Sequence, residues 1–242
     1  MILKGKTALV TGSTSGIGLG IAQCLARQGA NIVLNGFGDV EGPKAAVTAL
    51  GAKVAYHGAD MSKPAEIEAM MAFAEATFGG VDVLVNNAGI QHVAQIEDFP
   101  VERWDAIIAI NLSSAFHTTR LALPGMRTRN WGRVINIASV HGLVASAAKS
   151  AYVASKHGQA GMTDALRQEL RGTGVRITAI YPPNIEDISP LNISEWNGVR
   201  EPTSWLTNKD VAGTIIGSLS RARHVHFMSV LLETATSNFH GH

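Results

Sequence analysis

The sequence predicts an α/β domain in which helices cover both faces of a parallel sheet. Short apolar runs at 7–10, 32–34, 53–56, 81–85, 134–137 and 175–180 alternate with segments that have helical periodicity. The runs are apolar at nearly every position, which indicates strands that are buried on both faces. Strands that alternate with helices of about ten or more residues imply βαβ units, and therefore a parallel, doubly wound sheet.

The helical segments follow these runs in order along the chain. Residues 17–28 follow a glycine-rich turn, a second helix begins near Pro43, and residues 64–78 have the period of a third. Proline is well suited to the first turn of a helix. We expect a long helix over 101–129, another over 151–171 and a last one over 210–219, followed by an apolar run at 225–232.

The chain is expected to form a single domain over 1–242, because 242 residues suit one large domain better than two. Residues 182–206 are the exception to the alternating pattern, since they contain four prolines and two tryptophans and have no clear period. A connection of this length is typical of a lid or a binding loop. We therefore expect a substrate lid there.

Composition excludes several classes of protein. Twenty basic and nineteen acidic side chains give a net charge of +1, and no basic stripe indicates a nucleic-acid partner. The apolar stretches are far shorter than the roughly 20 residues of a membrane span. The first strand begins too early to leave room for a signal peptide, and the single cysteine, Cys24, favours a reducing compartment. We expect a cytoplasmic protein that binds a small molecule, with no metal site.

A glycine-rich turn at residues 11–18, Thr-Gly-Ser-Thr-Ser-Gly-Ile-Gly, lies between the first strand and the first helix. Glycines let the chain turn tightly and bring backbone N–H groups close to a pyrophosphate at a helix N-terminus. The alternative is a strand–helix turn that binds nothing. The strand–turn–helix context favours a dinucleotide site.

The choice of cofactor depends on charge near the adenosine ribose. A 2′-phosphate is usually met by Arg or Lys, and a free 2′-hydroxyl by Asp or Glu. Neither Ser13, Thr14 and Ser15 nor residues 36–38 supply a cation, and the acidic marker is missing as well. The absence of a cation favours nicotinamide adenine dinucleotide (NAD) over its phosphorylated form.

Tyr152 and Lys156 are candidates for acid–base chemistry. They are four residues apart, and on a helix they would share one face. A nearby ammonium stabilises tyrosinate and lowers the phenol pKa from its ordinary value near ~10. Tyr152 would then be the base in alcohol oxidation and the acid in the reverse reaction, with Ser139 donating a hydrogen bond to the substrate oxygen. The alternative is that Tyr152 and Lys156 are ordinary helix residues.

Taken together, these motifs resemble the short-chain dehydrogenase/reductase family. The turn at 11–18, the Asn-Asn-Ala-Gly run at 86–89 and the Tyr-x-x-x-Lys pair at 152–156 occur in the family's order. The resemblance implies a Rossmann-like sheet of about seven parallel strands and a catalytic set of Asn111, Ser139, Tyr152 and Lys156. In that set, Asn111 would connect the site to solvent through water, and Lys156 would also bind the nicotinamide ribose. The cofactor contacts implied are Gly12, Thr14, Ser15, Gly16, Ile17, Gly18, Phe37, Asp60 (near the adenine), Met61, Asn87, Ala88, Gly89, Tyr152, Lys156, Pro182 and Ile185.

Within the family, the first 160 or so residues resemble a bacterial branch that interconverts D-3-hydroxybutyrate and acetoacetate with NAD. The local matches are residues 34–38, 87–92, 139–144 and 149–152. In that branch the positions matching Gln91, His141 and Lys149 bind the substrate carboxylate, next to those matching Ser139 and Tyr152. A hydroxy acid needs this combination of a cation and directional donors at one end.

The last third departs from that branch. Pro183 stands where most relatives have glycine, and Asp187 stands where they have a threonine that contacts the nicotinamide. Residues 181–232 are instead similar to other reductase branches, as in a natural mosaic or a constructed chimera. The rival functions are a broad-specificity carbonyl reductase or alcohol dehydrogenase, a 3-oxoacyl-acyl-carrier-protein reductase, and a non-catalytic NAD-binding scaffold. Intact Ser139, Tyr152 and Lys156 argue against the scaffold.

The family resemblance also implies a homo-oligomer, and specifically a tetramer. Family members pair through the helices that correspond to 101–129 and 151–171 in this chain. Phe116, Leu121 and Leu123 are candidates for apolar contact surface, although the same side chains would also suit the helix–sheet interface.

Overall fold

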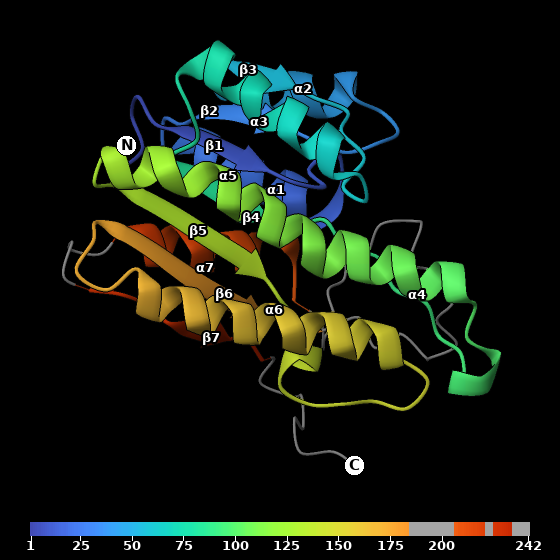
Figure 1. Cartoon of the computed structure of the whole chain (residues 1–242). Helices are drawn as coiled ribbons and strands as arrows, with labels where there is room; N and C mark the ends of the chain where they lie inside the picture. The colour runs from blue at the N-terminus through green and yellow to red at the C-terminus, as the bar shows by residue number, and fades with distance from the viewer. Residues whose placement is uncertain (184–205, 221–224, 234–242) are drawn as a thin grey trace.

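The computed structural model describes residues 1–183, 206–220 and 225–233. Its centre is a sheet of seven strands in the order β3-β2-β1-β4-β5-β6-β7, and every neighbouring pair is parallel (Figure 1). This order and the crossover between β1 and β4 are typical of a Rossmann sheet, so the predicted fold class is confirmed. The strands are β1 Thr7–Val10, β2 Asn31–Leu34, β3 Val54–Tyr56, β4 Val83–Asn86, β5 Gly132–Ile137, β6 Val175–Tyr181 and β7 Ser229–Leu231.

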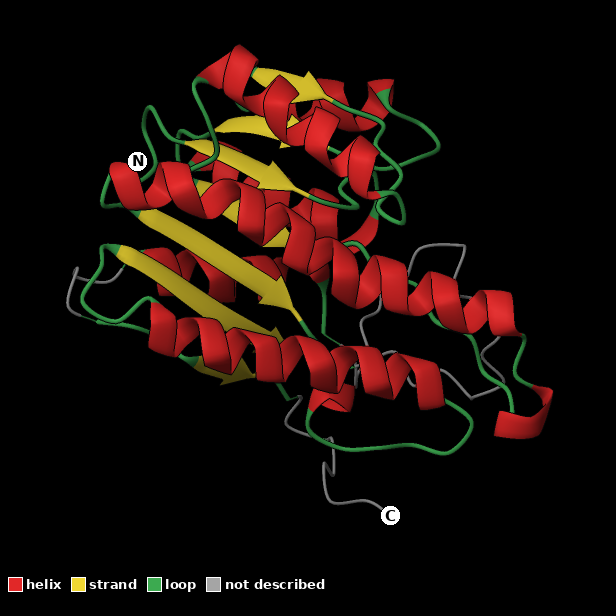
Figure 2. Ribbon diagram, viewed as in Figure 1, coloured by secondary structure: helices red, strands yellow, loops and turns green. Residues whose placement is uncertain are grey.

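Helices cover both faces of the sheet, as Figure 2 shows. The helices are α1 Gly16–Arg27, α2 Glu41–Thr48, α3 Pro64–Phe78, α4 Val101–Ile108, α5 Ser114–Thr128, α6 Ser150–Glu169 and α7 Asn208–Leu219. Helices α1, α2 and α7 pack on one face, and α3, α5 and α6 pack on the other. In β1, Ala8 and Val10 enter the first core and Leu9 enters the second. The continuous apolar runs therefore arise because both faces of each strand are buried.

Three predicted elements have different limits in the structure. Strand β4 begins at Val83 rather than at residue 81, although the Asp82 backbone already bonds to Thr7 and Arg133 and its carboxylate accepts from the Thr7 N–H at 3.0 Å. The apolar run at 225–232 forms only the three-residue strand β7. The long helix predicted over 101–129 is continuous but not uniform, because a π-helical turn, Ala109–Ser113, separates α4 from α5.

The carboxyl ends of the parallel strands meet at one edge of the sheet. Residues that follow β1, β2, β4 and β5 there are Thr11, Asn35, Asn87 and Ser139. In open α/β sheets the ligand crevice lies at this edge, where the strand order reverses. A ligand crevice is therefore expected at this edge of the sheet.

Candidate active site

The glycine-rich turn brings the backbone of the β1–α1 connection against the end of β4. Gly12 and Gly16 have φ angles of +61° and +54°, a region that residues with a side chain rarely adopt. A Cβ atom on Gly12 would lie 3.0 Å from Cα of Ala88, and one on Gly18 would collide with the Gly12 carbonyl oxygen. These glycines leave an open backbone surface at the N-terminus of α1.

Side-chain hydrogen bonds hold this turn in place. The Thr11 hydroxyl accepts from the backbone N–H groups of Asn87 and Ala88, each at 3.0 Å. The Asn87 amide donates to the carbonyls of Thr11 and Gly12, and Asn35 Oδ1 accepts from Gly12 N–H at 3.2 Å. Asn35 was not predicted as a site residue, although a polar residue directly after a buried strand was a signal for it.

The N-terminus of α1 fits an anionic group. Ser15, the residue before the helix, makes no side-chain capping bond, and the first turn contains no acidic residue. Unpaired N–H groups and the positive end of the helix dipole favour an anion at such a position. The predicted contacts Gly16, Ile17 and Gly18 form this first turn, so the residues present fit the pyrophosphate of a dinucleotide.

The segment beyond β2 forms the next part of the crevice. The Thr14 hydroxyl donates to the Phe37 carbonyl and the Tyr56 hydroxyl donates to the Gly36 carbonyl, both at 2.7 Å. The Phe37 side chain is 65% exposed. These bonds fix the backbone of 36–38 beside the glycine-rich turn and leave the Phe37 ring free to contact a ligand.

Asp60 and Met61 follow β3 on the same side of the sheet. Hydrogen bonds from the Ser62 backbone and hydroxyl hold the pKa of Asp60 below its ordinary value, so this carboxylate is ionised at neutral pH. Lys63 lies 3.5 Å from Asp60 Oδ2 and 3.0 Å from Glu66 Oε1. The positive charge of Lys63 is therefore already shared between two carboxylates.

Asn111 lies in the π-helical turn, and its amide bonds to two other segments. Its Oδ1 accepts from Ile90 N–H and its Nδ2 donates to the Ile90 carbonyl, both at 2.9 Å. The same Nδ2 lies 3.1 Å from the Ser155 hydroxyl on α6. Single π-helical turns are frequent at functional sites because they re-aim one side chain within a helix.

Ser139, Tyr152 and Lys156 meet where β5 ends and α6 begins. Lys156 is 3% exposed, donates from Nζ to the Ile137 carbonyl at 2.7 Å, and lies 5.7 Å from the centroid of the Tyr152 ring. The Ser139 hydroxyl lies near Tyr152 and favours the ionised form of its phenol. The structure thus brings the predicted catalytic side chains together.

The expectation that Lys156 lowers the pKa of Tyr152 is wrong for this structure. Burial raises the pKa of Tyr152, and the nearby Ser139 hydroxyl opposes this only in part. Burial also lowers the pKa of Lys156 to about 8, because its ammonium is removed from water. Tyr152 is therefore a neutral phenol at neutral pH, which suits a proton donor.

His141 lies against the catalytic pair. Its backbone N–H donates to the Ser139 hydroxyl at 3.2 Å, and its ring meets the Tyr152 ring edge-on at 5.8 Å between centroids. Its Nε2 lies 2.9 Å from the Ser146 hydroxyl. Burial, and then the positive charge of Lys149, lower the pKa of His141 to about 4, so the ring is neutral at neutral pH.

Lys149 immediately precedes α6 and is half-buried. Burial lowers the pKa of its ammonium group. Among the residues that the structure describes, none forms an ion pair or hydrogen bond with its side chain. A partly desolvated cation without a counter-ion is stabilised by a bound anion.

Gln91 lies on the loop that follows β4. It follows Ile90, whose backbone Asn111 holds, and its own side chain is half-buried. The Ala94 N–H donates to the Ala148 carbonyl at 3.0 Å, which connects the segment of Gln91 to the segment of His141 and Lys149. The loop of Gln91 is thereby connected to the segment that carries His141 and Lys149.

The remaining predicted residues are only partly within the described chain. Pro182 is buried, and its carbonyl accepts from Val140 N–H at 3.1 Å, whereas Ile185 and Asp187 lie outside the described residues. The expected lid at 182–206 is also outside them, except for its first two residues and its last. Across 1–183, 206–220 and 225–233, no helix is long and apolar enough to cross a membrane, and no group of three or more potential metal ligands occurs.

Comparison with known proteins relates this site to enzymes. Residues 6–197 match the family described as short chain dehydrogenase. The chain is 69% identical over 183 residues to the D-beta-hydroxybutyrate dehydrogenase of Cupriavidus necator, covering 75% of this chain and 71% of that protein. It is 58% identical over 190 residues to the Rhizobium meliloti protein of the same name, with coverages of 77% and 73%. The crystal structure of a metagenomic short-chain oxidoreductase in complex with NADP matches 98% of this chain and 100% of its own, with a TM-score of 0.84 at 30% identity.

The lowered pKa of His141 predicts a pH dependence of stability. The folded pKa is about 4 and the ordinary value is 6.5, so the unfolded chain binds more protons between these values. The stabilisation is complete above pH 6.5 and is lost as the pH falls through the folded pKa. We expect the wild-type free energy of unfolding to fall more steeply between pH 6.5 and 4 than that of His141→Asn, as measured by urea denaturation.

The control for this measurement is His157→Asn, which removes an exposed histidine from α6. It should fall nearly as steeply as the wild type, because the charge of His157 is the smallest of the three causes that lower the pKa of His141. Parallel curves for the wild type and His141→Asn would contradict the assignment of a buried, neutral His141.

Proposed function

The chain belongs to the short-chain dehydrogenase family, and from this premise we propose that it interconverts D-3-hydroxybutyrate and acetoacetate with NAD as the hydride carrier. The observation that carries the proposal is the half-buried Lys149, without a partner among the described residues, next to His141 and the catalytic pair. The two D-beta-hydroxybutyrate dehydrogenases similar to this chain support the same substrate.

Tyr152 is the proposed proton-transfer group. In acetoacetate reduction its phenol donates a proton to the carbonyl oxygen, while Ser139 donates a hydrogen bond to that oxygen. In oxidation the tyrosinate accepts the hydroxyl proton, so the raised pKa of Tyr152 favours reduction at neutral pH and oxidation at alkaline pH. The bound nicotinamide supplies the hydride donor or acceptor.

Lys149, His141 and Gln91 form the proposed carboxylate site. Lys149 supplies the charge, and the neutral His141 ring has one N–H donor. Gln91 supplies a second directional donor from the connected loop. With these roles, Lys149 would contact one end of a four-carbon hydroxy acid, and the proton-transfer residues would contact the other end.

Ala148 is the proposed positioning residue for this carboxylate site. Its φ angle is +60°, a conformation that costs about 1–2 kcal/mol for a residue with a Cβ atom. In this conformation its carbonyl accepts from Ala94 and the next residue is Lys149. Strain of this kind persists only where the surrounding structure requires it, and it is concentrated at ligand-binding sites.

The proposed cofactor contacts are the predicted ones within the described chain. The glycine-rich turn and the first turn of α1 would hold the pyrophosphate, Phe37, Asp60 and Met61 the adenosine half, and Asn87 to Gly89 with Tyr152 and Lys156 the nicotinamide half. A cation for a 2′-phosphate is absent from 13–15 and 36–38, and Lys63 is paired with two carboxylates. This arrangement supports NAD.

A broader carbonyl reductase of the same family is the second candidate. Its support is that the similarity to the D-beta-hydroxybutyrate dehydrogenase of Cupriavidus necator covers 71% of that protein, so part of that protein has no matched counterpart in this chain. Such an enzyme would not need a cation at Lys149. The two functions therefore differ in how they depend on this one residue.

Lys149→Ala should raise KM for D-3-hydroxybutyrate by about 10- to 150-fold, because a charge-assisted hydrogen bond contributes roughly 1.5–3 kcal/mol. The kcat/KM for (R)-2-butanol, which lacks the carboxylate, should not change. Tyr152→Phe should abolish turnover of both substrates. Steady-state kinetics test this, and equal effects of Lys149→Ala on both substrates would favour the broad reductase.

Ala148→Gly should raise KM for D-3-hydroxybutyrate severalfold while changing the free energy of unfolding little. Glycine relieves the left-handed strain but adds about 1 kcal/mol of conformational entropy to the unfolded chain, so the two effects on stability nearly cancel. Asn130→Gly, at the other non-glycine positive φ among the described residues, is the kinetic control. An unchanged KM in Ala148→Gly would remove the positioning role.

The kcat/KM with NAD should exceed that with NADP, because a 2′-phosphate would lack a free cation at 36–38. Gly38→Arg places a guanidinium at this turn, where a Cβ atom meets no atom within 4 Å. Gly38 has a φ of +83°, so Gly38→Ala is the matched control for backbone strain. Faster turnover of the wild type with NADP would contradict the cofactor assignment.

The enzyme is also proposed to be a homotetramer that pairs through α4, α5 and α6. Phe116 on α5 is 49% exposed, whereas Leu121 and Leu123 pack against the core between helices and sheet. Light scattering at micromolar concentration should give the mass of a tetramer, and Phe116→Glu should shift the population to smaller species. A wild-type monomer under these conditions would refute the proposal.

A further inference from the structure

A cavity of about 420 Å³ lies at the edge of the sheet opposite to the proposed active site. It is formed by the last turn of α6, the first residues of β6 and the segment that leads to β7. Three arginines, Arg167, Arg171 and Arg176, line it together with the apolar side chains Leu170, Val175 and Met228. Because Val175 and Arg176 begin β6 and Tyr181 ends it, the cavity is separated from the catalytic residues by the length of the strand.

Positive charge exceeds negative charge in this cavity. The acidic residue that lines it is Asp164, which pairs with Arg167 at 2.8 Å. Arg167 also donates to the Met228 carbonyl at 2.7 Å, and its Nε is buried with no hydrogen-bond partner. The exposed side chain of Arg171 makes no hydrogen bond or ion pair with a described residue. Arg171 therefore retains its donors for a further anion.

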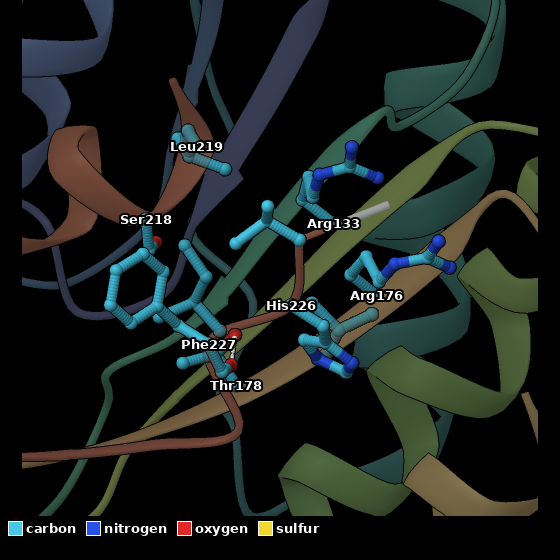
Figure 3. Close-up of a pocket in the computed structure, with 10 residues that line it drawn as sticks. Arg133, Arg176, Thr178, Ser218, Leu219, His226 and Phe227 are labelled. Atoms are coloured by element: carbon cyan, nitrogen blue, oxygen red, sulfur yellow. Dashed lines mark hydrogen bonds between the residues drawn. The ribbon is translucent and has the colours of Figure 1, made fainter. Parts of the chain in front are cut away.

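A neighbouring cluster extends the positive region. Arg133 on β5 and Arg176 on β6 are register partners in the parallel sheet, so their side chains leave the same face. Figure 3 shows both guanidinium groups with His226 beside Arg176. Burial lowers the pKa of His226, and the positive charges of the three arginines Arg176, Arg167 and Arg133 lower it further. Nε2 of His226 lies 2.7 Å from the Ile177 carbonyl. The neutral His226 ring leaves the net charge of this region to the arginines.

We propose that this cavity binds a small phosphate monoester. The exposed guanidinium of Arg171 presents forked donors that match phosphate oxygens. Arg167 and Arg176 already donate to the Met228 carbonyl and to the Thr173 and Val175 carbonyls, and they add positive charge to the wall of the cavity. The organic part would pack on Leu170, Val175 and Met228, and the volume lies within the range of about 300–1,000 Å³ of small-molecule sites. A bare phosphate ion would leave most of this volume and its apolar wall without contact. The proposal does not depend on the dehydrogenase reaction.

Calorimetric titration of the full chain with phenyl phosphate tests the proposal. We expect saturable binding that is tighter than that of inorganic phosphate, because the phenyl ring covers the apolar wall, and no binding of phenol. Arg171→Gln should weaken phenyl phosphate binding by at least about tenfold, since it removes a charged donor. Arg171 is exposed, so this variant should keep the wild-type unfolding temperature.

Arg27→Gln is the matched control, because Arg27 is exposed, as Arg171 is. Arg27 is the last residue of α1, and Arg171 lies just beyond the end of α6. It should bind phenyl phosphate as the wild type does, and saturating NADH should not displace the ligand from either protein. Binding that Arg171→Gln leaves intact, or that NADH displaces, would overturn the proposal. Binding of inorganic phosphate without tighter binding of phenyl phosphate would do so as well.

Discussion

The side-chain amide of Asn111 joins the three segments from which the candidate site is built. It satisfies both backbone polar groups of Ile90, directly before Gln91, and it contacts Ser155, directly before Lys156. Asn111 is 1% exposed, so an amide that missed these partners would be buried without hydrogen bonds. Asn111 lies in the π-helical turn between α4 and α5. The geometry of the site therefore depends on this short irregularity of the helix.

The substrate end depends on that arrangement through the connected loops. Once Ile90 is held, the bond from Ala94 to Ala148 places the residue before Lys149, and α6 begins from there with Tyr152 in its first turn. Burial then acts differently on each group, since it keeps His141 neutral, makes the charged form of Lys149 less favourable and raises the pKa of Tyr152. A carboxylate at Lys149 and a carbonyl oxygen at Tyr152 complement this distribution of charge.

Much of the fold could be predicted because its signals are local. Buried strands leave continuous apolar runs, and the turn before α1 requires glycines at Gly12 and Gly18 for reasons of space. The features that could not be predicted arise from tertiary packing. A five-residue π-helical turn leaves no periodic signal, the residue type of Ala148 gives no sign of a positive φ, and the direction of the Tyr152 pKa depends on burial by segments distant in sequence.

We propose that this site recognises a carboxylate at one end of a small ketone. This proposal is tested most directly by reduction of acetoacetate and of 2-butanone by the wild-type protein with NADH, because the two ketones differ in the carboxylate. We expect a kcat/KM for acetoacetate that is at least about tenfold higher than that for 2-butanone, because of a charge-assisted hydrogen bond to Lys149. Equal or faster reduction of 2-butanone would contradict it.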